Sequence, residues 1–142
     1  MDRKRIQSKL DTITTYTEKL IPHLEHSTHD IVHNDDLCAV VERYFQLIVD
    51  SAVSINSHVV ASLKGKTPDD YQGTFIALAE NNILDYQFAE KIADSVGLRN
   101  RIVHNYESVS KTQMGEDIKK NIGDYHEYVK QILAFLDRQS PE

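Results

Sequence analysis

Apolar residues recur along this chain at steps of three and four, the spacing that places side chains on one face of an α-helix. The first such stripe consists of Ile6, Leu10, Ile13, Thr17, Leu20 and Leu24. Pro22 is expected to end or bend this helix, because proline lacks the amide donor that a helix interior needs. The stretch P-H-L-E-H-S-T-H-D-I-V-H-N-D-D, residues 22–36, is polar and is predicted to be a loop.

A second, longer helix is predicted from Asp36 to about Leu63, which gives it a length of roughly 40 Å. It is apolar on two sides. One face carries Leu37, Val40, Val41, Tyr44, Ile48, Ala52, Ile55 and Val59, and the other carries Phe45, Val49, Val53 and Val60. A helix with two apolar faces is either central in a bundle or shared between the core and a partner.

Turn and cap residues divide the rest of the chain into three further helices. Gly65 is expected to end the second helix, and Thr67 with Pro68 to begin the third. Asp85 is expected to begin the fourth helix and Ser110 the last one. The last helix is predicted to be continuous, with a seam of Ile118, Ile122, Tyr125, Val129, Ile132 and Leu136. No strand pattern appears, so the sequence predicts an all-α, up-and-down bundle of about five helices in a single domain, residues 1–142.

Composition excludes several classes of protein. With 142 residues, 40% of them hydrophobic and 27% charged, the chain fits one globular core. Its net charge of −6 argues against a general nucleic-acid coating protein. The lone Cys38 excludes an internal disulfide. The first ten residues lack the apolar core of a signal peptide, and no apolar run reaches the roughly 20 residues of a membrane span, so a cytoplasmic protein is expected.

The stretch L-R-N-R-I-V-H-N-Y-E, residues 98–107, concentrates titratable and hydrogen-bonding groups at the end of the fourth helix. Histidine can move a proton near neutral pH, and arginine grips phosphate in a bidentate fork. RNA supplies its own nucleophile, the 2′-hydroxyl. Arg99 and His104 could therefore cleave RNA without a metal, while Asn100 and Asn105 orient the histidine or contact the ligand. The same residue types are equally compatible with capping of carbonyls and pairing with nearby acids.

Arg99 and His104 are five residues apart, about 140° around an ideal helix. They can meet on one small ligand only if the helix distorts or ends there, or if a second copy of the chain supplies one of them. Gly97 makes a distortion cheaper. Arg101 shares a face with His104.

The pattern of Arg99, four residues, His104, one residue and Tyr106 resembles the Arg-x4-His-x-Tyr signature of the HepT toxins, within the HEPN superfamily of helical ribonucleases. The segments M-D-R-K-R-I, A-V-V-E-R-Y-F-Q-L-I-V-D-S-A-V-S-I-N-S-H and Y-Q-G-T-F-I-A-L-A-E-N-N-I-L-D are similar to that family in the same order, so the resemblance covers nearly the whole chain.

The resemblance implies a HEPN-like homodimer whose two motifs face each other across the interface. It also implies metal-independent endoribonuclease activity without a cofactor, with Arg99 and His104 catalytic and with Asn100, Arg101 and Asn105 in support. It further implies a partner, an MntA-like minimal nucleotidyltransferase antitoxin that transfers AMP to the motif tyrosine, here Tyr106.

The long helix departs from the family pattern in one respect. Ser54 stands in a run where family members tend to carry an acid, and Asp50, one helical turn earlier, is the candidate replacement. Asn56 and His58 are polar groups that could line the cleft. The missing acid motivates an alternative function, a catalytically inactive HEPN module that binds a nucleotidyltransferase partner or a nucleotide.

A third hypothesis rests on four histidines in the predicted loop, His23, His26, His29 and His33. On a helix, such spacing could present two or three imidazoles to Zn²⁺, with Asp30 as a further ligand. Since Pro22 precedes the group and no cysteine accompanies it, a solvated connection is favoured over a metal site.

Overall fold

The computed structural model describes residues 1–104 and 110–139, and within these ranges the chain is entirely helical apart from its turns. These two ranges contain two more helices than the sequence predicted. The elements are α1 (Arg3–His23), α2 (Thr28–Val32), α3 (Asp35–Ser62), α4 (Tyr71–Glu80), α5 (Tyr86–His104), α6 (Lys111–Asn121) and α7 (Asp124–Arg138). The predicted all-α class is confirmed.

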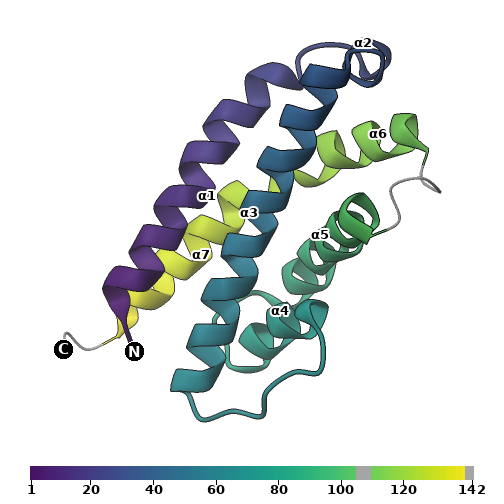
Figure 1. Ribbon diagram of the computed structural model, residues 1–142. Coiled ribbons are helices and arrows are strands. Elements are labelled where there is room, and N and C mark those ends of the chain that lie inside the picture. The colour runs from purple at the N-terminus through teal and green to yellow at the C-terminus, as the bar shows by residue number, and fades with distance from the viewer. Residues whose placement is uncertain (105–109, 140–142) are drawn as a thin grey trace.

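The long helix α3 is the centre of the bundle. This is one of the two roles that its two apolar faces predicted. It packs against α1 on one side and against α4 and α5 on the other. Figure 1 shows α1 and α3 side by side, with α7 behind them and with α4, α5 and α6 on the opposite side of α3. Both apolar faces of α3 are buried, and Phe45, Ile48, Ala52 and Val59 are fully enclosed.

The first additional helix, α2, lies in the stretch that was predicted to be a loop. Ser27 begins it, since its side chain accepts a hydrogen bond from the amide of Asp30. Ile31 then points into the core and is only 1% exposed. Because the neighbouring residues are mostly polar, the sequence pattern did not reveal that Ile31 anchors a helix. The prediction for Pro22 was close, because it lies in the last turn of α1, which ends at His23.

The second additional helix arises because the predicted final helix breaks at Ile122 and Gly123. The helix α6 ends at Asn121 and α7 begins at Asp124. The apolar seam continues across the break, with Ile118, Ile122 and Tyr125 all buried. The spacing of apolar residues therefore stays regular across a break in the helix, and it could not reveal that break.

Two of the predicted helix ends are shifted and two are confirmed. The turn after α3 uses Lys64 in the left-handed region, at φ 57°, and not Gly65. The next helix starts at Tyr71 behind the cap Asp70, and not at Pro68. Asp85 and Ser110 cap α5 and α6 as expected, since their side chains accept from the amides of Phe88 and Gln113 respectively. None of the helices in the described ranges has the length and apolar character to cross a bilayer.

Candidate active site at the end of helix α5

Helix α5 carries the arginine–histidine stretch and holds it firmly against the bundle. Its inner face buries Ala89, Ile92, Val96, Leu98 and Ile102. The helix continues through Gly97 as far as His104. The distortion that Gly97 was expected to permit is therefore absent, so Arg99 and His104 keep the wide angular separation of a regular helix.

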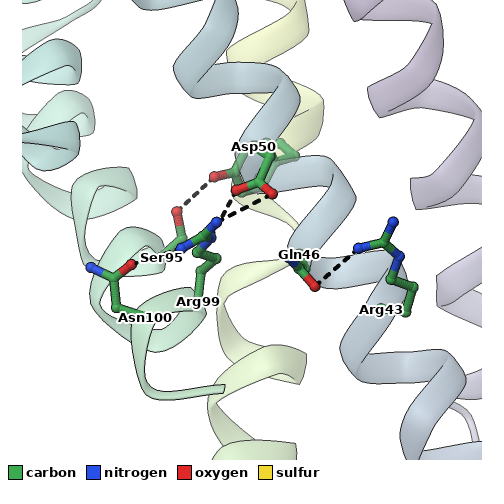
Figure 2. Close-up of polar contacts among 7 residues, drawn as sticks. Arg43, Gln46, Asp50, Ser95, Arg99 and Asn100 are labelled. Atoms are coloured by element: carbon green, nitrogen blue, oxygen red, sulfur yellow. Dashed lines mark hydrogen bonds and ion pairs between the residues drawn. The ribbon is translucent and has the colours of Figure 1, made fainter. Parts of the chain in front are cut away.

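The guanidinium of Arg99 is held by Asp50 of α3. Arg99 Nε lies 2.8 Å from Asp50 Oδ1, and a second nitrogen lies 3.4 Å from Oδ2. The Arg99 side chain is 15% exposed and that of Asp50 is 38% exposed. The remaining guanidinium nitrogen donates to Asn100 Oδ1 at 3.2 Å. Figure 2 shows Arg99 reaching from α5 to Asp50 of α3, with Asn100 next to Arg99 on α5. The carboxylate at this arginine thus comes from Asp50, the acid that the sequence offered in place of one at Ser54.

A second, fully buried pair of hydroxyls supports this region one turn before Arg99. The Ser95 hydroxyl donates to the carbonyl of Ile92, and the Tyr125 hydroxyl lies 2.6 Å from Ser95 Oγ. Burial raises the pKa of Tyr125, and the charges of Asp124 and Asp50 add to that effect. The Tyr125 hydroxyl therefore keeps its proton, and it donates to Ser95 because the Ser95 proton already goes to the Ile92 carbonyl. Figure 2 places Ser95 next to the Arg99–Asp50 pair.

Arg101 points to a different part of the bundle. One of its terminal nitrogens lies 3.4 Å from Asp117 Oδ2 of α6, and Gln113 donates to the other oxygen of the same carboxylate at 2.9 Å. Half of the Arg101 side chain is exposed. The two arginines are thus held by acids of two different helices, Asp50 and Asp117, and only the first was singled out in the sequence.

His104 is the last residue of α5 and is exposed. Within the part of the chain that the structure describes, its ring has no hydrogen-bond partner. Asn105 and Tyr106 lie outside the described residues. The structure therefore places Arg99, Asn100, Arg101 and His104 on one helix end, but it does not bring Arg99 and His104 onto a common ligand within one chain.

Two polar residues of α3 have other roles than the predicted one. Asn56 is fully buried, where its side-chain oxygen accepts from the Tyr128 hydroxyl at 2.6 Å and its amide donates to Thr74 Oγ1. His58 Nε2 accepts from the amide of Asp2 at 3.0 Å. Both side chains bind elements of the bundle together and do not line the site.

The four histidines that were considered as Zn²⁺ ligands, His23, His26, His29 and His33, do not come together at one point. His29 and His33 stack on successive turns at a centroid separation of 4.0 Å, whereas His23 lies against Tyr44. No group of three or more metal-ligating side chains occurs among residues 1–104 and 110–139. The Zn²⁺ hypothesis is therefore wrong for the described residues, because α1 and α2 are separate helices that point these rings apart.

Comparison with known proteins decides the family. The model of the family described as Ribonuclease HepT-like matches residues 13–132. The chain belongs to the HepT-like ribonucleases. A tRNA nuclease HepT from Aphanizomenon flos-aquae is 34% identical over 132 residues, which cover 92% of this chain and 89% of that protein.

Solved structures show that the fold is shared as well. A tri-AMPylated HEPN toxin of Shewanella oneidensis, solved in complex with its MNT antitoxin, superimposes with a TM-score of 0.82 at 22% identity, over 94% of this chain and 99% of that one. The cytosolic protein YutE of Bacillus subtilis has the same TM-score at 13% identity, over 96% of this chain and 92% of that one. At these identities the likeness establishes the HEPN fold, and the chemistry is argued from this chain's own residues.

Proposed function

We propose that this chain is a metal-independent endoribonuclease toxin, with Arg99 and His104 as its catalytic residues. The observation that carries the proposal is the Arg99–Asp50 ion pair, which fixes a guanidinium on the same helix end that carries the exposed imidazole of His104. The HepT-like family and the 34% identical tRNA nuclease support the assignment of RNA as the substrate.

The contacts of Arg99 leave it able to bind a phosphate. A guanidinium has five N–H donors. Two of them point to Asp50 and one to Asn100, so two remain. These can donate to a non-bridging phosphate oxygen and stabilise the charge that develops there, an effect worth about 10²–10³ in rate for one well-placed donor. Asp50 and Asn100 hold the plane of the group in one orientation.

The reaction follows from the two groups and from RNA itself. His104 takes the proton of a 2′-hydroxyl, and the 2′-oxygen attacks the adjacent phosphorus. The bond between phosphorus and the 5′-oxygen breaks, and that oxygen takes a proton from water or from a His104 imidazolium as it leaves. The products are a 2′,3′-cyclic phosphate and a 5′-hydroxyl, and the reaction as proposed uses no metal or cofactor.

A homodimer solves the problem of the angle between Arg99 and His104. Because α5 stays regular, one copy directs these two side chains to different sides. Two copies placed with their α5 ends together would let Arg99 of one act with His104 of the other. Arg101 of each copy, which lies one turn before His104, would add positive charge near this paired site of an acidic protein.

Regulation by an MntA-like nucleotidyltransferase antitoxin completes the proposal. AMP transferred to Tyr106 replaces a neutral phenol with a phosphodiester that carries about one negative charge. Tyr106 follows His104 by two residues in the sequence, and a negative charge there would compete with the RNA phosphate for Arg99 and His104. The Shewanella oneidensis toxin, which was solved AMPylated and with its antitoxin, supports this switch. Because the proposed substrate is RNA, the proposal takes this chain to act in the cytoplasm.

The test is cleavage of a defined RNA in the presence of EDTA by protein produced without the antitoxin. The wild type is expected to generate 2′,3′-cyclic phosphate ends, and His104→Ala to lose at least about a hundredfold in rate. His126→Ala, which changes an exposed histidine of α7, is the matched control. Cleavage that needs a metal, or that survives His104→Ala, contradicts the proposal.

The second candidate is a catalytically inactive HEPN module that binds a nucleotidyltransferase or a nucleotide. It is favoured by Ser54 in place of an acid and by the partial neutralisation of Arg99 by Asp50. It predicts no cleavage by the wild type, together with unchanged partner binding in His104→Ala. Growth arrest on expression without the partner would argue for the toxin.

A further inference from the structure

A polar groove lies on the side of α5 that faces away from the Arg99–Asp50 pair. It has a volume of about 370 Å³ and runs between α5, the first turn of α4 and the junction of α6 with α7. Its α5 wall consists of Lys91, Asp94, Gly97, Leu98 and Arg101, which lie at helical spacing along one face. The ten helical steps from Lys91 to Arg101 make this wall about 15 Å long.

The groove joins the candidate active site at one end. Arg101 forms that end, and His104 follows it by three residues on the same face of α5. Figure 1 shows α6 passing next to the carboxyl-terminal end of α5, the helix end that carries His104. A strand of RNA with its phosphate at His104 could therefore place a neighbouring nucleotide in the groove.

The charges in the groove are balanced but not all of them are paired. Three cations and three carboxylates line it, so its formal charge is zero. Lys91 pairs with Asp124 at 3.1 Å and Arg101 pairs with Asp117 at 3.4 Å. Asp94 and Lys120 are exposed and have no partner in the described part of the chain. Among its charged groups, the groove thus offers one unpaired acceptor, Asp94, and one unpaired donor, Lys120.

A glycine, which has no side chain, forms part of the floor of the groove. Gly97 lies in the interior of α5, where glycine destabilises a helix by roughly 0.5–1 kcal/mol relative to alanine. A Cβ at this position would stand 3.6 Å from Gln72 Nε2, directly between α5 and α4. The absence of a side chain leaves the Gln72 amide accessible from the groove.

We propose that this groove holds one unpaired RNA base next to the cleaved phosphate, and that Asp94 and Lys120 read its edge. The inference rests on the proposed function, because it takes RNA as the ligand. A carboxylate accepts from base N–H groups, a lysine donates to base oxygens or ring nitrogens, and an amide such as that of Gln72 can do either. The exposed guanidinium plane of Arg101 offers a surface for the base to stack on.

The charge balance favours a base over other ligands. A groove that tracks phosphates carries excess positive charge, and this one carries none. Its lining is mostly charged and amide groups, with Leu98 as an apolar exception, which does not suit an apolar peptide segment. Unpaired bases, in contrast, present donors and acceptors side by side on one edge.

The test measures binding, so that it does not depend on cleavage. Short 2′-O-methyl oligonucleotides, which lack the nucleophile, are titrated into wild-type protein and followed by fluorescence anisotropy. Each base in turn is replaced by an abasic unit. At one position the wild type is expected to lose about tenfold in affinity, the size expected for hydrogen bonds to charged groups. In the double variant Asp94→Ala with Lys120→Ala, the same replacement is expected to cost clearly less affinity, because only the contacts with Arg101 and Gln72 remain to be lost.

Asp11→Ala with Lys4→Ala is the matched control, since both residues are exposed on α1. An equal abasic loss in wild type and groove variant, or no loss at any position, overturns the inference. Loss of antitoxin binding with unchanged oligonucleotide binding also overturns it and makes the groove a protein-docking site. If the wild type shows the coupled loss but cleaves no RNA, the catalytic proposal fails and the groove assignment stands.

Discussion

Arg99 of α5 and Asp50 of α3 form an ion pair, with Nε and Oδ1 2.8 Å apart, that links the motif helix to the central helix of the bundle. The pair is partly exposed, so its contribution to stability is small. Its importance lies in orientation. A guanidinium that is gripped along one edge presents its other edge in a fixed direction, which is the condition for stabilising a transition state.

Asp50→Ala is expected to lower RNA cleavage by about tenfold to a hundredfold while the fold is retained, because a misplacement of about 1 Å in a catalytic group can have that effect. The loss should appear in kcat, and the shape of the pH profile should be unchanged because His104 is intact. Asp50→Glu should restore part of the activity.

Asp11→Ala, at an exposed position of α1, is the control for Asp50→Ala. Helicity from circular dichroism verifies the fold of each variant. If Asp50→Ala cleaves RNA at the wild-type rate, Asp50 does not position Arg99.

Tyr128→Phe is expected to lower the free energy of unfolding by about 1–3 kcal/mol, because it leaves a buried acceptor without its donor. The Tyr128 hydroxyl lies 2.6 Å from Asn56 Oδ1, and both residues are fully buried. Urea denaturation measures the effect. Tyr86→Phe removes a hydroxyl from a residue that is 50% exposed and should be nearly neutral. Equal stabilities of the two variants would show that Asn56 finds another partner.

Periodicity of apolar residues predicted the long helices of this fold well, because burial of one face determines where such helices pack. The stripe of α1 is an example, since Ile6, Leu10, Ile13 and Leu20 are all in the core. Short elements were not predicted, because they bury too few apolar residues to show a period. A single apolar residue, Ile31, anchors α2, and no period can be read from one residue. The break at Gly123 escaped because the seam of α6 continues into α7.

The sequence predicted which residues belong to the candidate site, but it did not predict which residues they contact. The motif itself drew attention to Arg99, Arg101 and His104, since their side chains carry recognisable chemistry. Asp117 gave no such signal, because an acid on a helix surface is ordinary until its partner in space is known. Asn56 misled for a related reason: a polar residue among apolar ones can equally line a cleft or bind a buried hydroxyl.

Gly97→Ala is expected to raise the free energy of unfolding by roughly 0.5–1 kcal/mol, because alanine favours the helix and its methyl group meets only ordinary contact at 3.6 Å. Gly115→Ala in α6 should gain less or lose stability, since its Cβ would lie 3.0 Å from Thr28 Cγ2. Thermal denaturation of both variants measures the difference. A larger gain for Gly115→Ala would contradict this account of the two sites.

Alkaline pH is expected to destabilise the protein through groups whose pKa is raised on folding. Burial and a hydrogen bond to Glu42 raise the pKa of Cys38 to about 11, and burial raises the pKa of both Tyr125 and Tyr128. Each folded group binds its proton more tightly than the unfolded one, whose pKa is about 8.5 for cysteine and about 10 for tyrosine. Their contribution is therefore complete below those values and is lost as pH rises above them.

The urea midpoint should accordingly fall from about pH 9 upward, and more steeply above about pH 10, with each group adding up to about 1.4 kcal/mol per pH unit. Tyr125→Phe is less stable at neutral pH, because Ser95 loses its partner, but its stability should decline less between pH 10 and 11 than that of the wild type. Tyr71→Phe, a residue 52% exposed, should follow the wild type. If the wild type and Tyr125→Phe decline in parallel, the Tyr125 hydroxyl ionises as readily in the folded protein as in the unfolded chain, and its burial does not hold it neutral.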